Sequence, residues 1–130
     1  TLMFQKEVAQ RIIAQPGGKA YGRLSVMVQW RCRAAALFDL PPRAFTPAPK
    51  VTSTVIGLQP RGVPLAPADA DRLSAMVAAA FGQRRKMLRS SLRQISSDPV
   101  GLLQAAGLEP TLRAENLSVE QFCALARAAD

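Results

Sequence analysis

The sequence predicts an α/β unit followed by a small all-α unit. Residues 1–61 mix short apolar, partly β-branched runs with short helical patterns, and residues 62–68 form a Pro-rich joint. Residues 69–130 carry helix caps and helical periodicity throughout. We therefore expect two units, 1–61 and 69–130, joined by a linker at 62–68, although 130 residues correspond to about one ordinary domain.

Two helices are expected in the first unit. Glu7–Ala14 places apolar residues at helical spacing, and Pro16-Gly17-Gly18 ends this pattern. A second helix is predicted over Leu24–Trp30. Its packed side is expected to carry Leu24, Met27 and Val28.

Three strands are the most that the first unit offers. Leu2–Phe4 is a short apolar run, and Val51–Leu58 is rich in Val, Thr and Ile. Arg33–Leu40 fits a helix or a buried strand by periodicity, and its short length before Pro41-Pro42 favours a strand. A parallel α/β sheet normally has five or more strands with both faces covered. The first unit therefore reads as the closing part of a sheet domain whose opening half is missing.

The second unit begins with a helix that Asp69 or Asp71 can cap. Its predicted apolar stripe consists of Leu73, Met76, Val77, Ala80 and Phe81. Gly82 interrupts this helix, and a further helix is predicted over Arg84–Gln94.

Two more helices complete the second unit. Asp98-Pro99 is a cap followed by proline at the first helical position, and Gly107 ends that helix. Ser118-Val119-Glu120-Gln121 is a capping box for a last helix that ends near Ala129. This last helix is expected to bury Phe122, Leu125 and Ala126.

Composition excludes several classes of function. Histidine is absent, which removes Ser-His-Asp and Cys-His hydrolases and His-based zinc enzymes. Cys32 and Cys123 are isolated, so we expect no metal site and a packing role in a reducing compartment. No apolar run is long enough to span a membrane and no signal peptide is visible, which favours a cytoplasmic protein without a membrane partner.

The charge points to a polyanionic partner. The net charge is +8, and residues 1–61 hold +7 of it. In the second unit the bases gather in one segment, as Arg84, Arg85, Lys86, Arg89 and Arg93. On a helix, Arg85, Arg89 and Arg93 share one face, where like charges cost about 0.2–0.5 kcal/mol per pair. A solvated basic face and a nucleic-acid contact both fit this pattern.

Two further segments combine an aromatic with a cation. In Phe45–Val51 the prolines stiffen the chain, so Phe45 can stack on a base with Lys50 near its phosphate, or simply fill the core below a loop. Tyr21-Gly22-Arg23 opens the second predicted helix. It fits either an anion site or an ordinary helix start.

Four segments together resemble the ribosomal RNA adenine N6-dimethyltransferases, most closely the bacterial KsgA type. They are Phe4–Ala9, Tyr21–Val26, Phe45–Ser53 (Phe-Thr-Pro-Ala-Pro-Lys-Val-Thr-Ser) and Phe81–Lys86 (Phe-Gly-Gln-Arg-Arg-Lys). The resemblance runs from about residue 1 to the C-terminus. The Phe45–Ser53 motif is highly specific, and the Phe81–Lys86 motif separates this branch from most others.

The resemblance implies a role for each matching residue. Phe45 would flank the flipped target adenine opposite an aromatic that lies upstream of this chain. Arg84, Arg85 and Lys86 would grip ribosomal RNA, with Arg89 and Arg93 on the same surface. Lys50 and Arg23 would contact phosphates. The reaction would transfer methyl groups from S-adenosylmethionine to N6 of two adjacent adenosines near the 3′ end of small-subunit ribosomal RNA.

The resemblance covers only the C-terminal half of such an enzyme. The chain would be the remnant of a Rossmann-like, S-adenosylmethionine-dependent sheet domain followed by a helical RNA-binding domain, without the Gly-rich cofactor loop. Alone it is expected to be inactive, to hold no cofactor site, and to self-associate through its exposed sheet. Two alternatives remain: a non-catalytic RNA-binding or ribosome-assembly module, and a large-subunit methyltransferase that confers antibiotic resistance.

Overall fold

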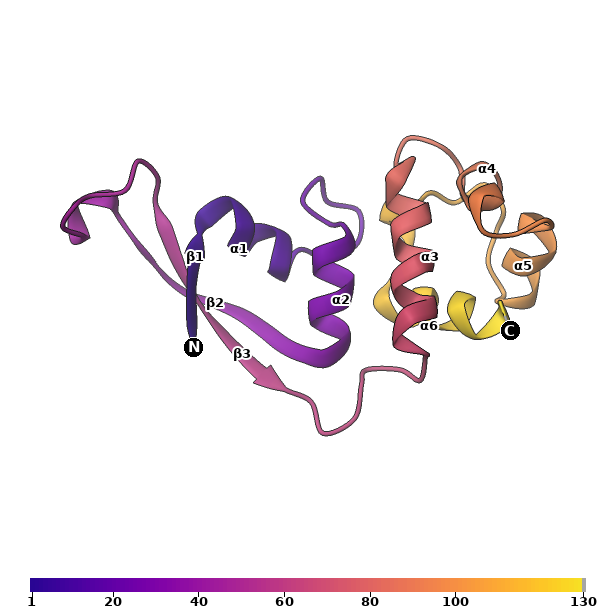
Figure 1. Ribbon diagram of the computed structural model, residues 1–130, viewed down its shortest axis with the longest axis horizontal. Helices are drawn as coiled ribbons and strands as arrows, with labels where there is room; N and C mark the ends of the chain where they lie inside the picture. Colours follow the sequence, from indigo (N-terminus) through magenta and orange to yellow (C-terminus); the bar gives the residue numbers. More distant parts are fainter. Residues whose placement is uncertain (130) are drawn as a thin grey trace.

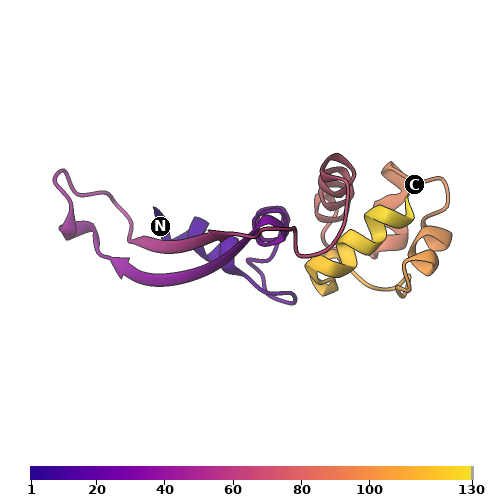
Figure 2. The ribbon, with the colours of Figure 1, turned by 90° about the horizontal axis from the view of Figure 1, so that it is seen from below.

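A computed structural model describes residues 1–129 as a three-stranded sheet with two helices, followed by a group of four helices (Figure 1). The first part contains β1 (Leu2–Gln5), α1 (Lys6–Ile13), α2 (Arg23–Arg31), β2 (Cys32–Leu40), the 3₁₀ turn η1 (Pro42–Ala44) and β3 (Ser53–Pro60). The second part contains α3 (Ala70–Gly82), α4 (Leu88–Ser91), η2 (Leu92–Gln94), α5 (Pro99–Ala105), η3 (Ala114–Asn116) and α6 (Val119–Ala128). The hairpin of β2 and β3 and the helical group lie at opposite ends of an elongated molecule (Figure 2).

The sheet has the three predicted strands, but their pairing is antiparallel, which corrects the parallel arrangement considered from the sequence. The strand order is β1-β3-β2, and β3 pairs antiparallel with both neighbours. Since β1 and β2 both oppose β3, they run parallel to each other without touching. The third strand is Ser53–Pro60 and not Val51–Leu58, because Val51 still belongs to the loop that precedes it.

Only one face of the sheet is covered within residues 1–129. Helix α1 lays Ala9 and Ile12 against Ile56 on that face. On the other face a bulge in β2 places Leu37 beside Gly57, and the side chains of Leu37 and Phe38 are 54% and 55% exposed. The sheet therefore shows an apolar face with no cover from this part of the chain.

Local capping chemistry begins three of the four helices in the second half as predicted. The carboxylate of Asp69 accepts a hydrogen bond from the Arg72 amide, and that of Asp98 accepts one from Gly101. At α6, Ser118 and Gln121 exchange two bonds between side chain and backbone, which is the predicted capping box. The predicted burial of Phe122, Leu125 and Ala126 is likewise confirmed.

The helix predicted over Arg84–Gln94 is wrong. Gln83–Lys86 forms a turn, and Met87 is extended, with ψ near 150°. Met87 pairs with Arg113 in an isolated antiparallel bridge, and the Leu88 amide donates to the Leu112 carbonyl. These long-range backbone bonds replace the helical ones at Met87, so only Leu88–Ser91 and one 3₁₀ turn are helical.

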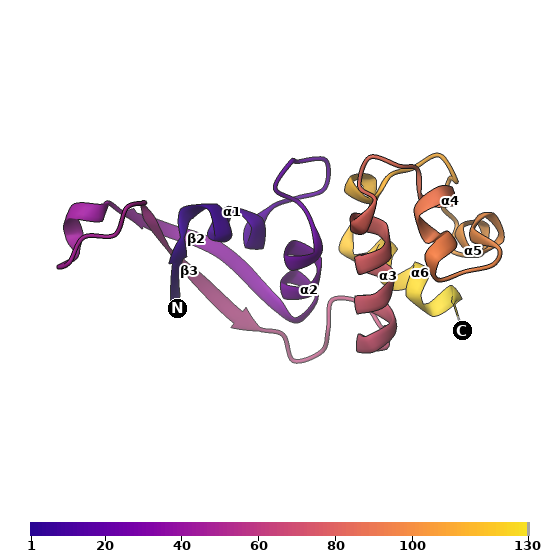
Figure 3. The same ribbon diagram turned by 45° about the horizontal axis from the view of Figure 1, so that its top comes forward.

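Helix α2 belongs to two neighbourhoods, and its predicted packed side is wrong in part. Val26 and Trp30 are buried in the core of the second half. Helix α2 contacts α3 and α6, and Figures 1 and 3 show it beside α3. The Ser25 hydroxyl donates to the Arg11 carbonyl of α1. Leu24, placed on the packed side from the sequence, is 40% exposed. Because α2 packs against other elements on two sides, it buries residues that a single apolar stripe does not identify.

The larger core therefore crosses the expected boundary at residues 62–68. Its buried members from the first part are Tyr21, Val26 and Trp30, and the remainder come from α3 to α6. The indole Nε1–H of Trp30 donates to the Ala66 carbonyl over 2.8 Å, which ties the segment between β3 and α3 to α2.

Both cysteines are free thiols. Cys123 is fully buried on α6, where desolvation raises the pKa of its thiol to about 11, with a smaller contribution from the charge of Glu120. Arg127 acts in the opposite direction. Cys32 is half-buried at the junction of α2 and β2. Cys123 accordingly serves packing, as expected from the sequence.

Candidate nucleic-acid interface

Five cations line a hollow of about 590 Å³ on the second half of the chain, which we call the basic pocket. They are Arg85, Lys86, Arg89, Arg93 and Arg113. The other lining residues are Gln83, Met87, Ser90 and Gln94, so the hollow contains no carboxylate. The pocket thus brings together four of the five bases that the sequence singled out, although they do not share one helix.

The backbone around the basic pocket is anchored to the core of the second half. Leu88 and Leu92 are fully buried in the core, which fixes the short α4–η2 segment carrying Arg89 and Arg93. The bridge between Met87 and Arg113 then joins this segment to the chain before η3. Arg113 was not identified from the sequence, because a single long-range bridge leaves no periodic signal.

The cations of the basic pocket are available to an anion. Within residues 1–129 none of the five takes part in an ion pair, since the two pairs present are Lys6 with Asp39 and Arg11 with Glu7. The side chains of all five cations are exposed. Guanidinium groups bind phosphate oxygens through paired hydrogen bonds, so this hollow is chemically suited to a phosphate backbone.

Arg84 is turned away from the basic pocket. One of its guanidinium nitrogens donates to the Gly18 carbonyl over 2.9 Å, and the group lies 5.6 Å from the centre of the Phe81 ring. The side chain therefore ties the end of α3 to the loop between α1 and α2. Its predicted contact with RNA remains a prediction.

Arg23 and Lys50 also lie outside the basic pocket. Arg23 is the exposed first residue of α2. Lys50 lines a separate hollow of about 460 Å³ beside the start of α1, together with Lys6 and Pro42. The structure therefore distributes the predicted phosphate contacts over several surfaces.

Phe45 lies in the loop that closes the β2–β3 hairpin. Its amide donates to the Pro42 carbonyl, which ends the η1 turn, and its side chain is half-buried. Where the strands enter this loop, Asp39 accepts a 2.7 Å hydrogen bond from the Thr54 hydroxyl and pairs with Lys6 at 3.0 Å. These two partners, Thr54 first, lower the pKa of Asp39 below its usual value.

Phe45 and the basic pocket are not brought together. The hairpin loop projects from the sheet on the side away from the helical group, while α4 lies at the far end of that group (Figures 1 and 3). A single small ligand cannot touch both, whereas an extended polymer can.

Tyr21 is a core residue. It is completely buried, its hydroxyl donates to the Leu117 carbonyl over 2.7 Å, and its ring meets Phe81 edge-on. Burial, and to a lesser extent the charge of Glu120, raises the pKa of Tyr21 above its usual value. The motif around Tyr21 therefore acts as a helix start, with the Ser25 hydroxyl accepting from the Gly22 amide.

Residues 1–129 show neither a metal-binding cluster nor a membrane-spanning helix. No group of three or more His, Cys, Asp and Glu side chains is placed to hold a metal ion there. Among the helices of the same residues, none has the length and apolar character needed to cross a membrane.

Comparison with curated proteins identifies close relatives. The chain is 61% identical over 129 residues to the ribosomal RNA small subunit methyltransferase A of Rhodospirillum rubrum, covering 99% of this chain and 44% of the relative. The protein of the same name from Ruegeria sp. is 61% identical over 127 residues, covering 98% and 45%. The chain thus spans less than half the length of the curated relatives it matches.

Solved structures share the fold. A crystal structure of a dimethyladenosine transferase from Plasmodium falciparum superposes with a TM-score of 0.81 at 23% identity, over 95% of this chain and 54% of that one. The 23S rRNA methyltransferase ErmE gives a TM-score of 0.64 at 23% identity, over 98% and 53%.

The family-level comparison covers the whole chain. The profile described as ribosomal RNA adenine dimethylase matches residues 1–130. This match agrees with the four motifs and with the two solved folds. The chain belongs to the ribosomal RNA adenine dimethylase family.

Proposed function

We propose that the complete protein methylates N6 of two adjacent adenosines near the 3′ end of small-subunit ribosomal RNA, with S-adenosylmethionine as the methyl donor. Relatives that are 57–61% identical carry the name of small subunit methyltransferases, which supports this substrate. The observation on the molecule itself that supports it most is the basic pocket, a hollow lined by five cations and no carboxylate. The place of action is the cytoplasm.

We propose that the cofactor site of the complete protein lies outside this chain. Residues 1–129 contain no Gly-rich turn between a strand and a helix, and the one carboxylate on the strands, Asp39, is already held by Thr54 and Lys6. We infer that residues 1–61 complete a methyltransferase domain whose cofactor-binding part lies outside this chain. The chain alone is then inactive.

Each part of the chain has a separate task in this proposal. Residues 69–130 bind ribosomal RNA through Arg85, Lys86, Arg89 and Arg93 of the basic pocket, and Arg113 joins them. Residues 62–68 link this unit to the sheet. Phe45 stacks on the target adenine and holds its exocyclic amine in position, while Lys50 and Arg23 contact phosphates.

The uncovered sheet face supports one property of the chain in isolation. Leu37, Phe38 and Met3 are each more than half exposed on this face or its edge strand. An apolar sheet face with an unpaired edge favours association. We propose that the chain on its own self-associates there.

Methylation of isolated ribosomal subunits tests the substrate. The complete protein is expected to transfer labelled methyl groups to small subunits that lack the modification, and not to large subunits. Label in the large subunit alone would contradict the proposal and favour the large-subunit enzyme class. The 23S rRNA methyltransferase ErmE resembles this chain in fold only. Tight RNA binding without any label would favour the non-catalytic module.

Charge reversal tests the basic pocket. We expect Arg85→Glu with Arg89→Glu to weaken RNA binding and to reduce the slope of log K against log salt by about 1 for each phosphate that the variant no longer neutralises. The slope is measured by titration at several salt concentrations. Arg11→Glu with Lys19→Glu is the matched control, since it reverses two exposed charges outside the pocket. An equal change of slope in the control would contradict a specific role for the pocket.

A further inference from the structure

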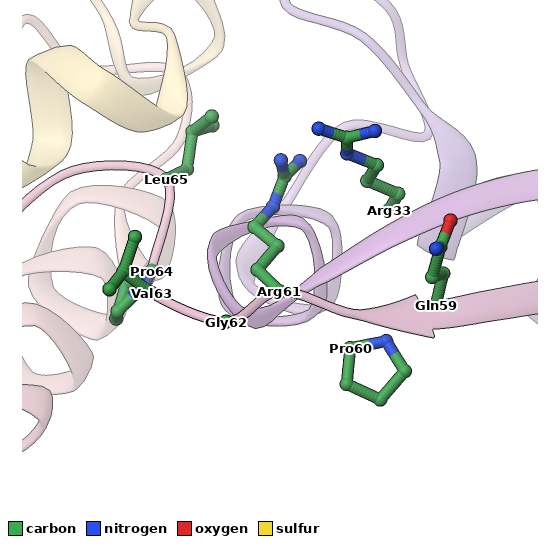
Figure 4. A pocket seen from close by; sticks show the side chains of 8 residues that line it. All are labelled: Arg33, Gln59, Pro60, Arg61, Gly62, Val63, Pro64 and Leu65. Carbon is green, nitrogen blue, oxygen red and sulfur yellow. The ribbon is translucent and has the colours of Figure 1, made fainter.

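A second group of arginines lies where the sheet meets the segment before α3. Arg33 and Arg61 line two adjoining hollows of about 570 and 360 Å³. The larger hollow is bounded by Gln59–Leu65, and the smaller one also touches the start of α6. Figure 4 shows the guanidinium groups of Arg33 and Arg61 rising on the same side of the strands. We call Arg31, Arg33 and Arg61 the arginine seam.

The backbone of the arginine seam is fixed in place. The Arg61 amide donates to the Arg31 carbonyl over 2.9 Å, and the Arg61 Nε–H donates to the Gln29 carbonyl over 3.1 Å. The guanidinium of Arg31 lies 4.4 Å from the centre of the buried Trp30 ring. Because these contacts order two of the three side chains beforehand, binding an anion costs less conformational entropy.

No carboxylate within residues 1–129 neutralises the seam, since none of the three arginines takes part in an ion pair there. Glu120 is the one acidic residue lining either hollow, and it makes no ion pair with the seam in the described chain. Guanidinium groups that are not neutralised by a carboxylate are chemically matched to phosphate oxygens.

We propose that the arginine seam binds the phosphodiester backbone of RNA as a second contact, separate from the basic pocket. This inference rests on the proposed function for the identity of the ligand as RNA. Arg31 and Arg33 are joined by an extended residue, and two extended residues span about 7 Å. Arg33 and Arg61 line two adjoining hollows, and Arg31 lies against the Trp30 ring outside both, so the three cations do not surround one point. This arrangement favours a polymer over a free phosphate ion.

The two cationic surfaces flank α3. The seam adjoins residues 62–65, which precede α3, and the basic pocket includes Gln83, the residue directly after α3. Figure 1 shows these two segments at opposite ends of α3. A 13-residue helix is about 20 Å long at about 1.5 Å per residue. The two surfaces therefore contact different stretches of one folded RNA, and their contributions to affinity should be independent.

Charge removal with little change of shape tests the seam. In the complete protein, Arg33→Gln is expected to reduce the slope of log K against log salt by about 1, and Arg33→Gln with Arg61→Gln by about 2. The probe is a transcript of the 3′ end of small-subunit ribosomal RNA. Arg11→Gln is the control, since it removes one exposed charge from α1, outside the seam and the basic pocket. This substitution also removes the ion pair of Arg11 with Glu7. The Arg33 side chain lines the hollows without an ion pair in the described chain, so this variant keeps the fold, as thermal unfolding would verify.

The outcomes separate this inference from the proposed function. If Arg33→Gln changes the slope no more than Arg11→Gln does, the seam is not an RNA contact, whatever the basic pocket variants show. If inorganic phosphate binds and loses affinity on Arg33→Gln while RNA binding is unchanged, the seam is a small-anion site and the proposal fails. If the seam variants weaken RNA binding and Arg85→Glu with Arg89→Glu does not, the seam is an RNA contact and the basic pocket is not.

Discussion

Replacing Phe45 by alanine is expected to reduce methylation of the small subunit by about 10- to 100-fold while RNA affinity falls less than about threefold. Stacking of a base on an aromatic ring contributes about 1–3 kcal/mol, and in this proposal that contact is made by the target adenine alone. Most of the affinity comes from phosphate contacts, which the Phe45 side chain does not supply. Single-turnover methylation rates and RNA titration measure the two quantities on the same preparations.

Phe45→Tyr and Phe38→Ala are the controls for this experiment. Phe45→Tyr keeps a ring at the tip of the hairpin and should retain most of the rate. Phe38→Ala removes a ring from β2 of the same hairpin, outside the loop that carries Phe45. Equal losses of rate and affinity in Phe45→Ala, together with a lower melting temperature, would mean that this half-buried ring supports the loop and does not hold the adenine.

The parts of the fold that follow local chemistry were predictable from the sequence. Asp69, Asp98 and Ser118 begin helices because each accepts an amide hydrogen bond three residues on, and those bonds depend only on nearby residues. The three strands were found for a related reason, since short apolar runs between turn residues carry their own signal.

The parts that depend on distant contacts were not predictable. The predicted helix at Arg84–Gln94 failed because Met87 bonds to Arg113, a partner far along the chain. The antiparallel pairing of β1 and β2 with β3 likewise depends on topology, which strand propensity does not record. The sequence still indicated four of the five basic residues of the pocket, because their clustering along the chain does not depend on the secondary structure predicted for them.

The motif resemblance added what these patterns could not. Composition left a solvated basic face and a nucleic-acid contact equally open, and the family match now favours the second. The arginine seam was not predicted, because Arg31, Arg33 and Arg61 belong to none of the four motifs. They lie close together only because the start of β2 pairs with the end of β3.

Trp30→Ala is expected to lower the free energy of unfolding by about 3–5 kcal/mol. The Trp30 side chain is 2% exposed, lies in the core shared by α2, α3 and α6, and donates to the Ala66 carbonyl. Its removal leaves a cavity at the place where the two halves of the chain share one core, and it leaves the Ala66 carbonyl without this donor. Guanidinium denaturation of the complete protein, followed by circular dichroism, measures the loss.

Two further variants separate packing from hydrogen bonding at Trp30. Trp30→Phe keeps most of the buried ring and loses the bond to Ala66, so the expected loss is smaller, about 1–2 kcal/mol. Val63 is on the same segment as Ala66 but is 77% exposed, so Val63→Ala should change the free energy of unfolding by less than about 0.5 kcal/mol. If Trp30→Ala costs no more than Val63→Ala, the helical group holds together without α2, and the shared core does not couple the two halves. A full loss means instead that packing of α2 couples the sheet to the helical group, and therefore helps to set the separation of Phe45 and the basic pocket, the two surfaces proposed to contact RNA.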